Sequence, residues 1–124
     1  MARILVAEDE PSVRAFITRC LDRAGYQVTT ACDGQQALTL LTRNTYDLLL
    51  TDIVMPEMDG IALALRVARD WPDLRVVMIS GYPQERMRAH NLNVLVHRIV
   101  AKPFSMQELL DAVADSLKTG PAAQ

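Results

Sequence analysis

Acidic, hydroxyl and ammonium side chains follow several short apolar runs of the sequence. Glu8 and Asp9 come after residues 4–7, Asp52 shortly after residues 48–50, Ser80 after residues 76–79 and Lys102 after residues 99–101. Carboxylate oxygens are hard ligands that suit Mg²⁺, which proteins commonly hold with one or two carboxylates and a substrate phosphate. If folding gathers these groups, the chemistry they favour is metal-assisted transfer of a phosphoryl group to a carboxylate.

Each of these groups has a role to fill in such a site. Asp9 and Asp52 are the expected direct ligands of Mg²⁺, and Glu8 is expected to bind the ion directly or through water. The Asp52 carboxylate would attack the phosphorus and form an aspartyl phosphate. Lys102 would pair with the phosphoryl oxygens as a point charge, and the Ser80 hydroxyl would donate a hydrogen bond to them.

Structural roles compete with this interpretation for every residue taken alone. Acids favour a helix N-terminus, so Glu8 and Asp9 could belong to a helix cap. Asp52 could form a turn, and Ser80 and Lys102 could be ordinary loop residues beside glycine and proline. The joint occurrence of these groups at successive strand ends favours the functional interpretation.

Apolar periodicity indicates five strands that alternate with helices. The expected strands are short apolar or β-branched runs, at residues 4–7, 26–31, 48–50, 76–79 and 99–101. Helices are expected from Pro11 to Gly25, after Asp33, from Ile61 to Trp71, briefly within residues 83–96, and onward from a capping box of Ser105 and Glu108.

This alternation predicts an α/β fold with a doubly wound, five-stranded parallel sheet, because parallel neighbours need crossover connections. Ligands of such sheets bind beyond the carboxyl ends of the strands. The polar groups at the strand ends should therefore share one edge of the molecule.

The composition is that of one soluble globular domain. The chain has 124 residues, so we expect a domain over residues 1–118 and a short flexible tail over residues 119–124. A net charge of -2 provides no field that would attract nucleic acid or a membrane surface. No leader or membrane-spanning run is evident, so the cytoplasm is the expected location.

Cys20 and Cys32 lack the spacing of metal or redox motifs and are expected to be reduced core residues.

Four segments, "ILVAEDE", "DLLLTDIVMPEMDG", "MISG" and "AKPF", resemble in order and spacing the receiver domains of two-component response regulators. The resemblance extends from Arg3 to Lys118. It implies a (βα)5 flavodoxin-like fold with strand order 2-1-3-4-5. It also implies that Asp52 accepts phosphate from a histidine kinase or a histidine phosphotransferase.

The same resemblance assigns further residues. It implies that Glu8, Asp9 and Asp52 hold Mg²⁺ together with the main-chain carbonyl of Val54, and that Ser80 and Lys102 sense the phosphoryl group. The remaining assignments are main-chain contacts to that group, made by Ile53 and Gly81, and structural roles for Gly60 and Pro103. A cis peptide bond is expected before Pro103.

One departure from the family pattern, and the residues at two positions that influence how water reaches the phosphoryl group, have expected consequences. Receivers usually carry an aromatic residue three positions before the lysine, where this chain has Ile99. We therefore expect signalling to depend on Ser80 and on repacking of residues 81–96. The positions two after Asp52 and two after Ser80 are Val54 and Tyr82, neither of which can activate water strongly, so self-dephosphorylation should be slow.

Output is expected to pass through protein contacts, because no effector domain follows the receiver segment. In receivers the fourth helix, fifth strand and fifth helix usually form the docking face. The basic residues expected there, together with Ile99 and Tyr82, are Arg86, Arg88, His97 and Arg98. A solvated charged surface is the alternative interpretation of this basic run.

Among receivers, the chain is similar to stand-alone members that assist proteolysis by the ClpXP protease. This similarity implies a ClpX-type protease partner, with the unphosphorylated form active. Within the family, the alternatives are a phosphoryl shuttle and the receiver module of a hybrid histidine kinase. We expect the chain to catalyse only its own phosphorylation and dephosphorylation.

Two classes outside the family share some features. A flavodoxin-like electron carrier has the same layout, but acids stand here where its phosphate-binding loop would lie. A phosphatase with an aspartyl intermediate would carry a second acid at the position of Val54. Both classes are therefore disfavoured.

Overall fold

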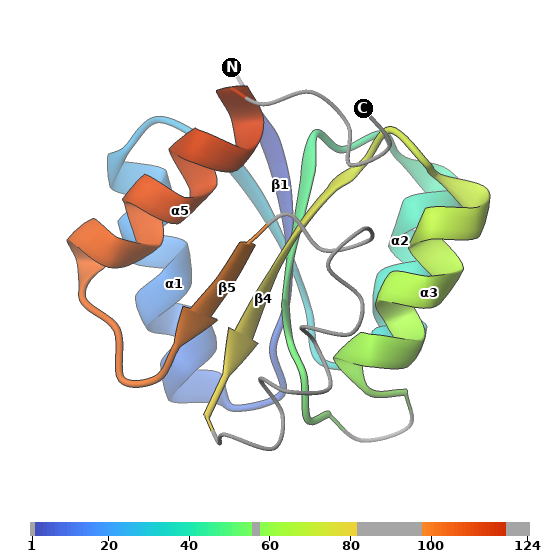
Figure 1. Ribbon diagram of the computed structural model, residues 1–124, viewed down its shortest axis with the longest axis horizontal. Helices are drawn as coiled ribbons and strands as arrows, with labels where there is room; N and C mark the ends of the chain where they lie inside the picture. The colour runs from blue at the N-terminus through green and yellow to red at the C-terminus, as the bar shows by residue number, and fades with distance from the viewer. Residues whose placement is uncertain (1, 56–57, 82–97, 119–124) are drawn as a thin grey trace.

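A five-stranded parallel sheet forms the centre of the molecule in the computed structural model, which describes residues 2–55, 58–81 and 98–118 (Figure 1). The strand order is β2-β1-β3-β4-β5, and every neighbouring pair is parallel. The order reverses between β1 and β3, which places the switch point of the sheet beside its central strand. The doubly wound fold expected from the sequence is confirmed.

The elements follow the alternation that the apolar pattern predicts. Their bounds are β1 Arg3–Ala7, α1 Pro11–Arg23, β2 Gln27–Ala31, α2 Gly34–Arg43, β3 Leu48–Asp52, α3 Gly60–Asp70, β4 Arg75–Ser80, β5 Arg98–Ala101 and α5 Met106–Lys118. The short helix expected within residues 83–96 lies outside the described residues. Among the described helices, none is long and apolar enough to cross a bilayer.

Two hydrophobic clusters form, one on each face of the sheet. Helices α1 and α5 cover one face and α2 and α3 cover the other (Figure 1). All five residues of β3 are buried, as expected of a central strand covered on both sides. Leu49 belongs to the cluster under α2 and α3, whereas Leu48 and Leu50 belong to the cluster under α1 and α5. Each buried leucine stabilises the fold by about 1.5–3 kcal/mol, so β3 is held firmly in place.

Side-chain caps fix where the helices begin. Asp33 accepts a hydrogen bond from the main-chain N–H of Gln36 at the start of α2, and Asp59 does the same for Ala62 at the start of α3. These bonds satisfy N–H groups that have no partner within the first turn.

The capping box predicted for the last helix is confirmed. The Glu108 N–H donates to Ser105 Oγ over 3.1 Å, and the Ser105 N–H donates to Glu108 Oε1 over 3.0 Å. This reciprocal pair sets the start of α5 directly after the segment that carries Lys102.

One detail of the expected core is wrong. Cys20 is buried, but Cys32 is exposed, because it lies just past the end of the edge strand β2. On α3 the buried face is formed by Leu63, Ala64 and Val67, while Leu65 is 49% exposed. The apolar residues of α3 surround most of the helix, so periodicity alone did not identify the buried side.

Candidate functional site

The strand register brings the predicted site residues to one edge of the sheet. Ala7 pairs with Thr51, Asp52 pairs with Ile79, and Ser80 pairs with Ala101. The residues that end or follow β1, β3, β4 and β5 therefore lie side by side. The structure brings Glu8, Asp52 and Lys102 into direct contact, with Asp9 and Ser80 beside them.

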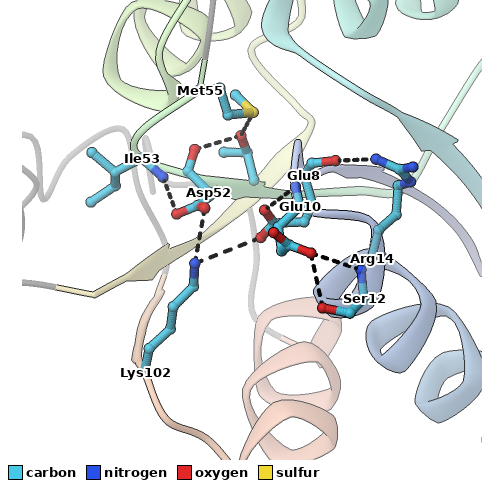
Figure 2. A network of polar contacts seen from close by, with 9 residues as sticks. Glu8, Glu10, Ser12, Arg14, Asp52, Ile53, Met55 and Lys102 are labelled. Atoms are coloured by element: carbon cyan, nitrogen blue, oxygen red, sulfur yellow. Dashed lines mark hydrogen bonds and ion pairs between the residues drawn. The ribbon is translucent and has the colours of Figure 1, made fainter.

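Asp52 lies at the end of the central strand with only 5% of its surface exposed. The Ile53 N–H donates to Asp52 Oδ1 over 2.9 Å, and Lys102 Nζ donates to Asp52 Oδ2 over 2.9 Å (Figure 2). One carboxylate oxygen is thus fixed by its own main chain and the other by a cation. Both contacts hold the carboxylate in one orientation at the strand end.

Gly60 allows the loop after β3 to return close to Asp52. Its N–H donates to the carbonyl of Ile53 over 2.7 Å, and a Cβ at this position would collide with the main-chain carbonyl of Asp52. Only glycine fits where two backbone segments approach this closely. The loop therefore depends on Gly60 for its path.

Glu8 is fully buried beside this pair. Its Oε2 accepts a hydrogen bond from the Glu10 N–H over 3.0 Å, and its Oε1 lies 3.8 Å from Lys102 Nζ. Among the described residues, none donates a hydrogen bond to Oε1. A buried carboxylate oxygen without a donor is costly, and a bound cation would satisfy it.

Burial raises the pKa of Glu8 to about 7. The hydrogen bond from the Glu10 N–H opposes this rise, the negative charge of Asp52 adds to it, and the charge of Lys102 opposes it. The raised pKa thus reflects chiefly the burial of the Glu8 carboxylate away from water.

A divalent cation fits the acidic cluster on the evidence of its geometry. Oxygen atoms of Glu8, Asp9 and Asp52 lie within 4.8 Å of one another, and Asp9 is exposed to solvent. Carboxylates with access to water are the donor set of Mg²⁺. The Glu8 oxygen that lacks a donor supports the same conclusion.

Replacing Glu8 with glutamine is expected to stabilise the metal-free protein above neutral pH. The folded pKa of about 7 exceeds the ordinary value of 4.5, so Glu8 contributes stability below pH 4.5 that is lost as the pH rises through about 7. The loss is on the order of 3 kcal/mol. Chemical unfolding with a chelator, from pH 4 to 8, should show a flatter pH dependence for Glu8→Gln than for the wild type. Identical slopes would contradict the buried-charge interpretation.

Ser80 and Lys102 are joined through their main chains. Ser80 is fully buried, and its carbonyl accepts a hydrogen bond from the Lys102 N–H over 2.8 Å. The bond between Lys102 and Pro103 is cis, in agreement with the expectation from the sequence. A Cβ added at Gly81 would lie 3.7 Å from Lys102 Cδ, so Gly81 lies alongside the lysine stem.

An open cleft of about 580 Å³ lies over Asp52 and includes residues that sequence analysis did not assign to the site. Its lining is Ser12, Val13 and Phe16 from α1 with Asp52, Val54, Gly81, Lys102, Pro103 and Phe104. The rings of Phe16 and Phe104 lie 6.0 Å apart. Phe104 could have been assigned to the site from its place in the "AKPF" segment. Phe16 could have been proposed from the apolar periodicity of α1, which predicts a side chain that faces the sheet. The cleft thus has charged groups, Asp52 and Lys102, beside an apolar wall formed chiefly by Phe16 and Phe104.

The expected output residues are only partly described. Ile99 is partly buried and packs against the cluster under α2 and α3. Arg98 forms an exposed ion pair with Asp115 of α5, with 2.7 Å between Nη1 and Oδ2. Tyr82, Arg86, Arg88 and His97 lie outside the described residues.

Comparison with known proteins identifies the family. Residues 4–114 match the response regulator receiver domain. The chain is 38% identical over 117 residues to the response regulator receiver protein CpdR of Brucella abortus, covering 94% of this chain and 98% of that protein. It is 34% identical to sporulation initiation phosphotransferase F of Bacillus subtilis, with 90% of each covered. The response regulator TrrA of Thermotoga maritima, solved with Mg²⁺-BeF, superposes with a TM-score of 0.85 at 30% identity, covering 93% of this chain and 98% of that one. The chain belongs to the receiver domains of two-component response regulators.

Proposed function

We propose that Asp52 accepts a phosphoryl group from a histidine kinase or a histidine phosphotransferase, in a reaction that requires Mg²⁺. The observation that carries this proposal is the contact of 2.9 Å between Lys102 Nζ and Asp52 Oδ2, beside the buried Glu8 carboxylate. The ion would be held by Glu8, Asp9 and Asp52 with the main-chain carbonyl of Val54. When bound, Mg²⁺ supplies positive charge to the phosphoryl oxygens.

The chain's own groups then have defined tasks. An Asp52 carboxylate oxygen forms a bond to phosphorus while the bond from phosphorus to the donor's imidazole nitrogen breaks and that nitrogen keeps the electron pair. The Ile53 N–H orients the carboxylate, and Lys102 transfers its ion pair to the phosphoryl oxygens. The Ser80 hydroxyl and the main-chain N–H of Gly81 complete the set of donors, and the apolar wall of the cleft limits access of water.

The output of this switch is binding to a protein partner. Phosphorylation replaces the ion pair between Asp52 and Lys102, and Lys102 follows directly after β5. A change there reaches Arg98 and Ile99, which lie on the same strand. The partner that we propose is a ClpX-type protease component, bound by the unphosphorylated form, because the chain aligns along nearly its whole length with CpdR.

Intact mass after incubation with acetyl phosphate and Mg²⁺ tests the proposed chemistry. The wild type is expected to gain the mass of one phosphoryl group. Asp52→Asn, which keeps the side-chain shape and removes the nucleophile, is expected to gain none. A chelator should prevent the gain in the wild type. A phosphorylated Asp52→Asn protein would show that another residue is the acceptor.

A phosphoryl shuttle is the second candidate function, favoured by the similarity to sporulation initiation phosphotransferase F. A shuttle returns its phosphoryl group to a histidine-containing transfer domain, whereas an adaptor binds a partner in one phosphorylation state. Phosphorylated protein should therefore be incubated separately with a histidine phosphotransferase and with ClpX. Transfer without ClpX binding would favour the shuttle.

Replacing Val54 with asparagine is expected to speed loss of the phosphoryl group several-fold. Val54 is 55% exposed at the mouth of the cleft, and its apolar side chain cannot orient a water molecule toward phosphorus. An asparagine amide offers both a donor and an acceptor there. The half-life of phosphorylated protein, followed by intact mass, measures the effect. Leu65→Asn on α3 is the control, because Leu65 is 49% exposed and does not line the cleft. Equal half-lives for all three proteins would contradict this explanation.

A further inference from the structure

Residues 8–10, here called the acidic segment, are contacted by Arg14 from the side opposite Lys102 (Figure 2). It is partly buried in the first turns of α1, and its Nη1 donates to the main-chain carbonyl of Glu8 over 2.8 Å. Its guanidinium therefore reaches back from the helix to the residue that directly precedes Asp9. This contact is made to the main chain, so it restrains the path of the segment.

The acidic segment is tied at several further points. The Glu8 N–H donates to the carbonyl of Ala31 in β2 over 3.0 Å, and the Glu10 N–H donates to Glu8 Oε2. The first bond fixes where the segment leaves the sheet, and the second folds the Glu8 side chain back onto the segment. Arg14 holds the carbonyl between these two points, so three restraints act on one residue.

The position of Arg14 within its helix is electrostatically unfavourable. A helix N-terminus carries a partial positive charge, which favours acids and disfavours cations in the first turn. Arg14 is the fourth residue of α1, and that turn contains no acid. The N-cap carboxylate of Glu10 attracts Arg14, but it is hydrogen-bonded to Ser12 rather than to Arg14. A cation at this place is better explained by its bond to the Glu8 carbonyl than by stabilisation of the helix.

We propose that Arg14 is a positioning residue for the acidic segment: its guanidinium fixes the Glu8 main chain so that the carboxylates of Glu8 and Asp9 are placed to bind Mg²⁺ together. The inference rests on the proposed function for its metal. Partners that orient metal ligands commonly raise metal affinity 10-fold to 100-fold. Arg14 acts in this way through the main chain.

Charge alone predicts the opposite effect on metal binding. Arg14 is a cation near a cation site, so removing it would tighten Mg²⁺ binding if electrostatic repulsion were its main influence. Positioning predicts weaker binding. The sign of the change in dissociation constant therefore separates the two explanations.

The test compares Arg14→Met, Arg14→Lys and Arg19→Met with the wild type. Methionine keeps much of the apolar stem but loses charge and donor, lysine keeps both, and exposed Arg19 is a matched cation on α1. Calorimetric titration with Mg²⁺ should give a dissociation constant raised about 10-fold for Arg14→Met. Arg14→Lys should recover most of the affinity, and Arg19→Met should match the wild type.

Amide hydrogen exchange in the metal-free protein is the second measurement. The Glu10 amide, bonded to Glu8 Oε2, is expected to exchange faster in Arg14→Met than in the wild type or Arg19→Met. Unchanged or tighter Mg²⁺ binding by a folded Arg14→Met would overturn the proposal. If that variant does not fold, Arg14→Gln takes its place, because it also lacks the guanidinium charge. Weaker Mg²⁺ binding by a folded Arg14→Gln supports the proposal, and unchanged or tighter binding overturns it. A wild type that binds no Mg²⁺ would refute the proposed function, while the exchange of the Glu10 amide would still report on the positioning by Arg14.

Discussion

Replacing Gly60 with alanine is expected to destabilise the protein by about 3 kcal/mol or more. The added Cβ would collide with the carbonyl of Asp52 and approach Ile53 Cα to 3.0 Å. Both obstacles are backbone atoms at the end of the central strand, which has buried neighbours on both faces and cannot shift cheaply. Relief must come from the loop after β3, so the site should be disturbed along with the fold.

Gly25→Ala is the control for this substitution. Gly25 has φ of 93°, but a Cβ there would meet no atom within 4 Å. Its replacement should cost only about 1–2 kcal/mol, from the left-handed backbone alone. Chemical unfolding measures both values. A Gly60→Ala protein no less stable than Gly25→Ala would show that the close approach to Asp52 can relax.

Replacing Lys102 with methionine is expected to slow phosphorylation by acetyl phosphate about 100-fold. Methionine keeps an unbranched apolar stem and removes the ammonium group that lies 2.9 Å from Asp52 Oδ2. Loss of one such preorganised group commonly lowers a catalysed rate by about 100-fold to 1,000-fold. The initial rate of phosphoryl gain, at saturating Mg²⁺, is the quantity to measure.

Mg²⁺ binding should respond to the same change in the opposite direction. Two carboxylates about 5 Å apart repel by roughly 3 kcal/mol at an effective dielectric near 20, so removal of the compensating cation should favour a dication. Lys118→Met is the matched control, because Lys118 is exposed at the end of α5. Slow phosphorylation with unchanged or tighter Mg²⁺ binding would place Lys102 at the phosphoryl group. A normal rate would contradict that role.

Sequence alone was sufficient for the sheet because its strands have little ambiguity. The run Leu48 to Leu50 is too short and too apolar for a surface helix, and its burial on both faces agrees with that pattern. Once the strands are parallel, the place where Glu8, Asp52 and Lys102 meet follows from the topology. Their meeting at one edge of the sheet could therefore be predicted without knowing how the side chains pack.

The helices were harder to orient from sequence. Apolar residues of α3 occur on several sides, so the exposure of Leu65 depends on how the helix packs against the sheet. The contribution of α1 to the cleft depends on the same kind of packing, because Phe16 packs near Phe104, a residue far from it in the sequence. The hydrogen bond from Arg14 to the Glu8 carbonyl could not be predicted either, because every residue has a main-chain carbonyl and the residue types do not indicate which one accepts.

The Asp52 carboxylate belongs to a central strand, whereas Lys102, the cation that contacts it, follows an edge strand. Asp52 ends a strand with a neighbour on each side, whereas Lys102 follows the outermost strand β5, which is paired only with β4 among the described strands. A displacement of β5 would disrupt backbone pairing along a single border. Lys102 is therefore expected to shift at a smaller cost in backbone hydrogen bonds than Asp52, whose strand is paired along both of its borders.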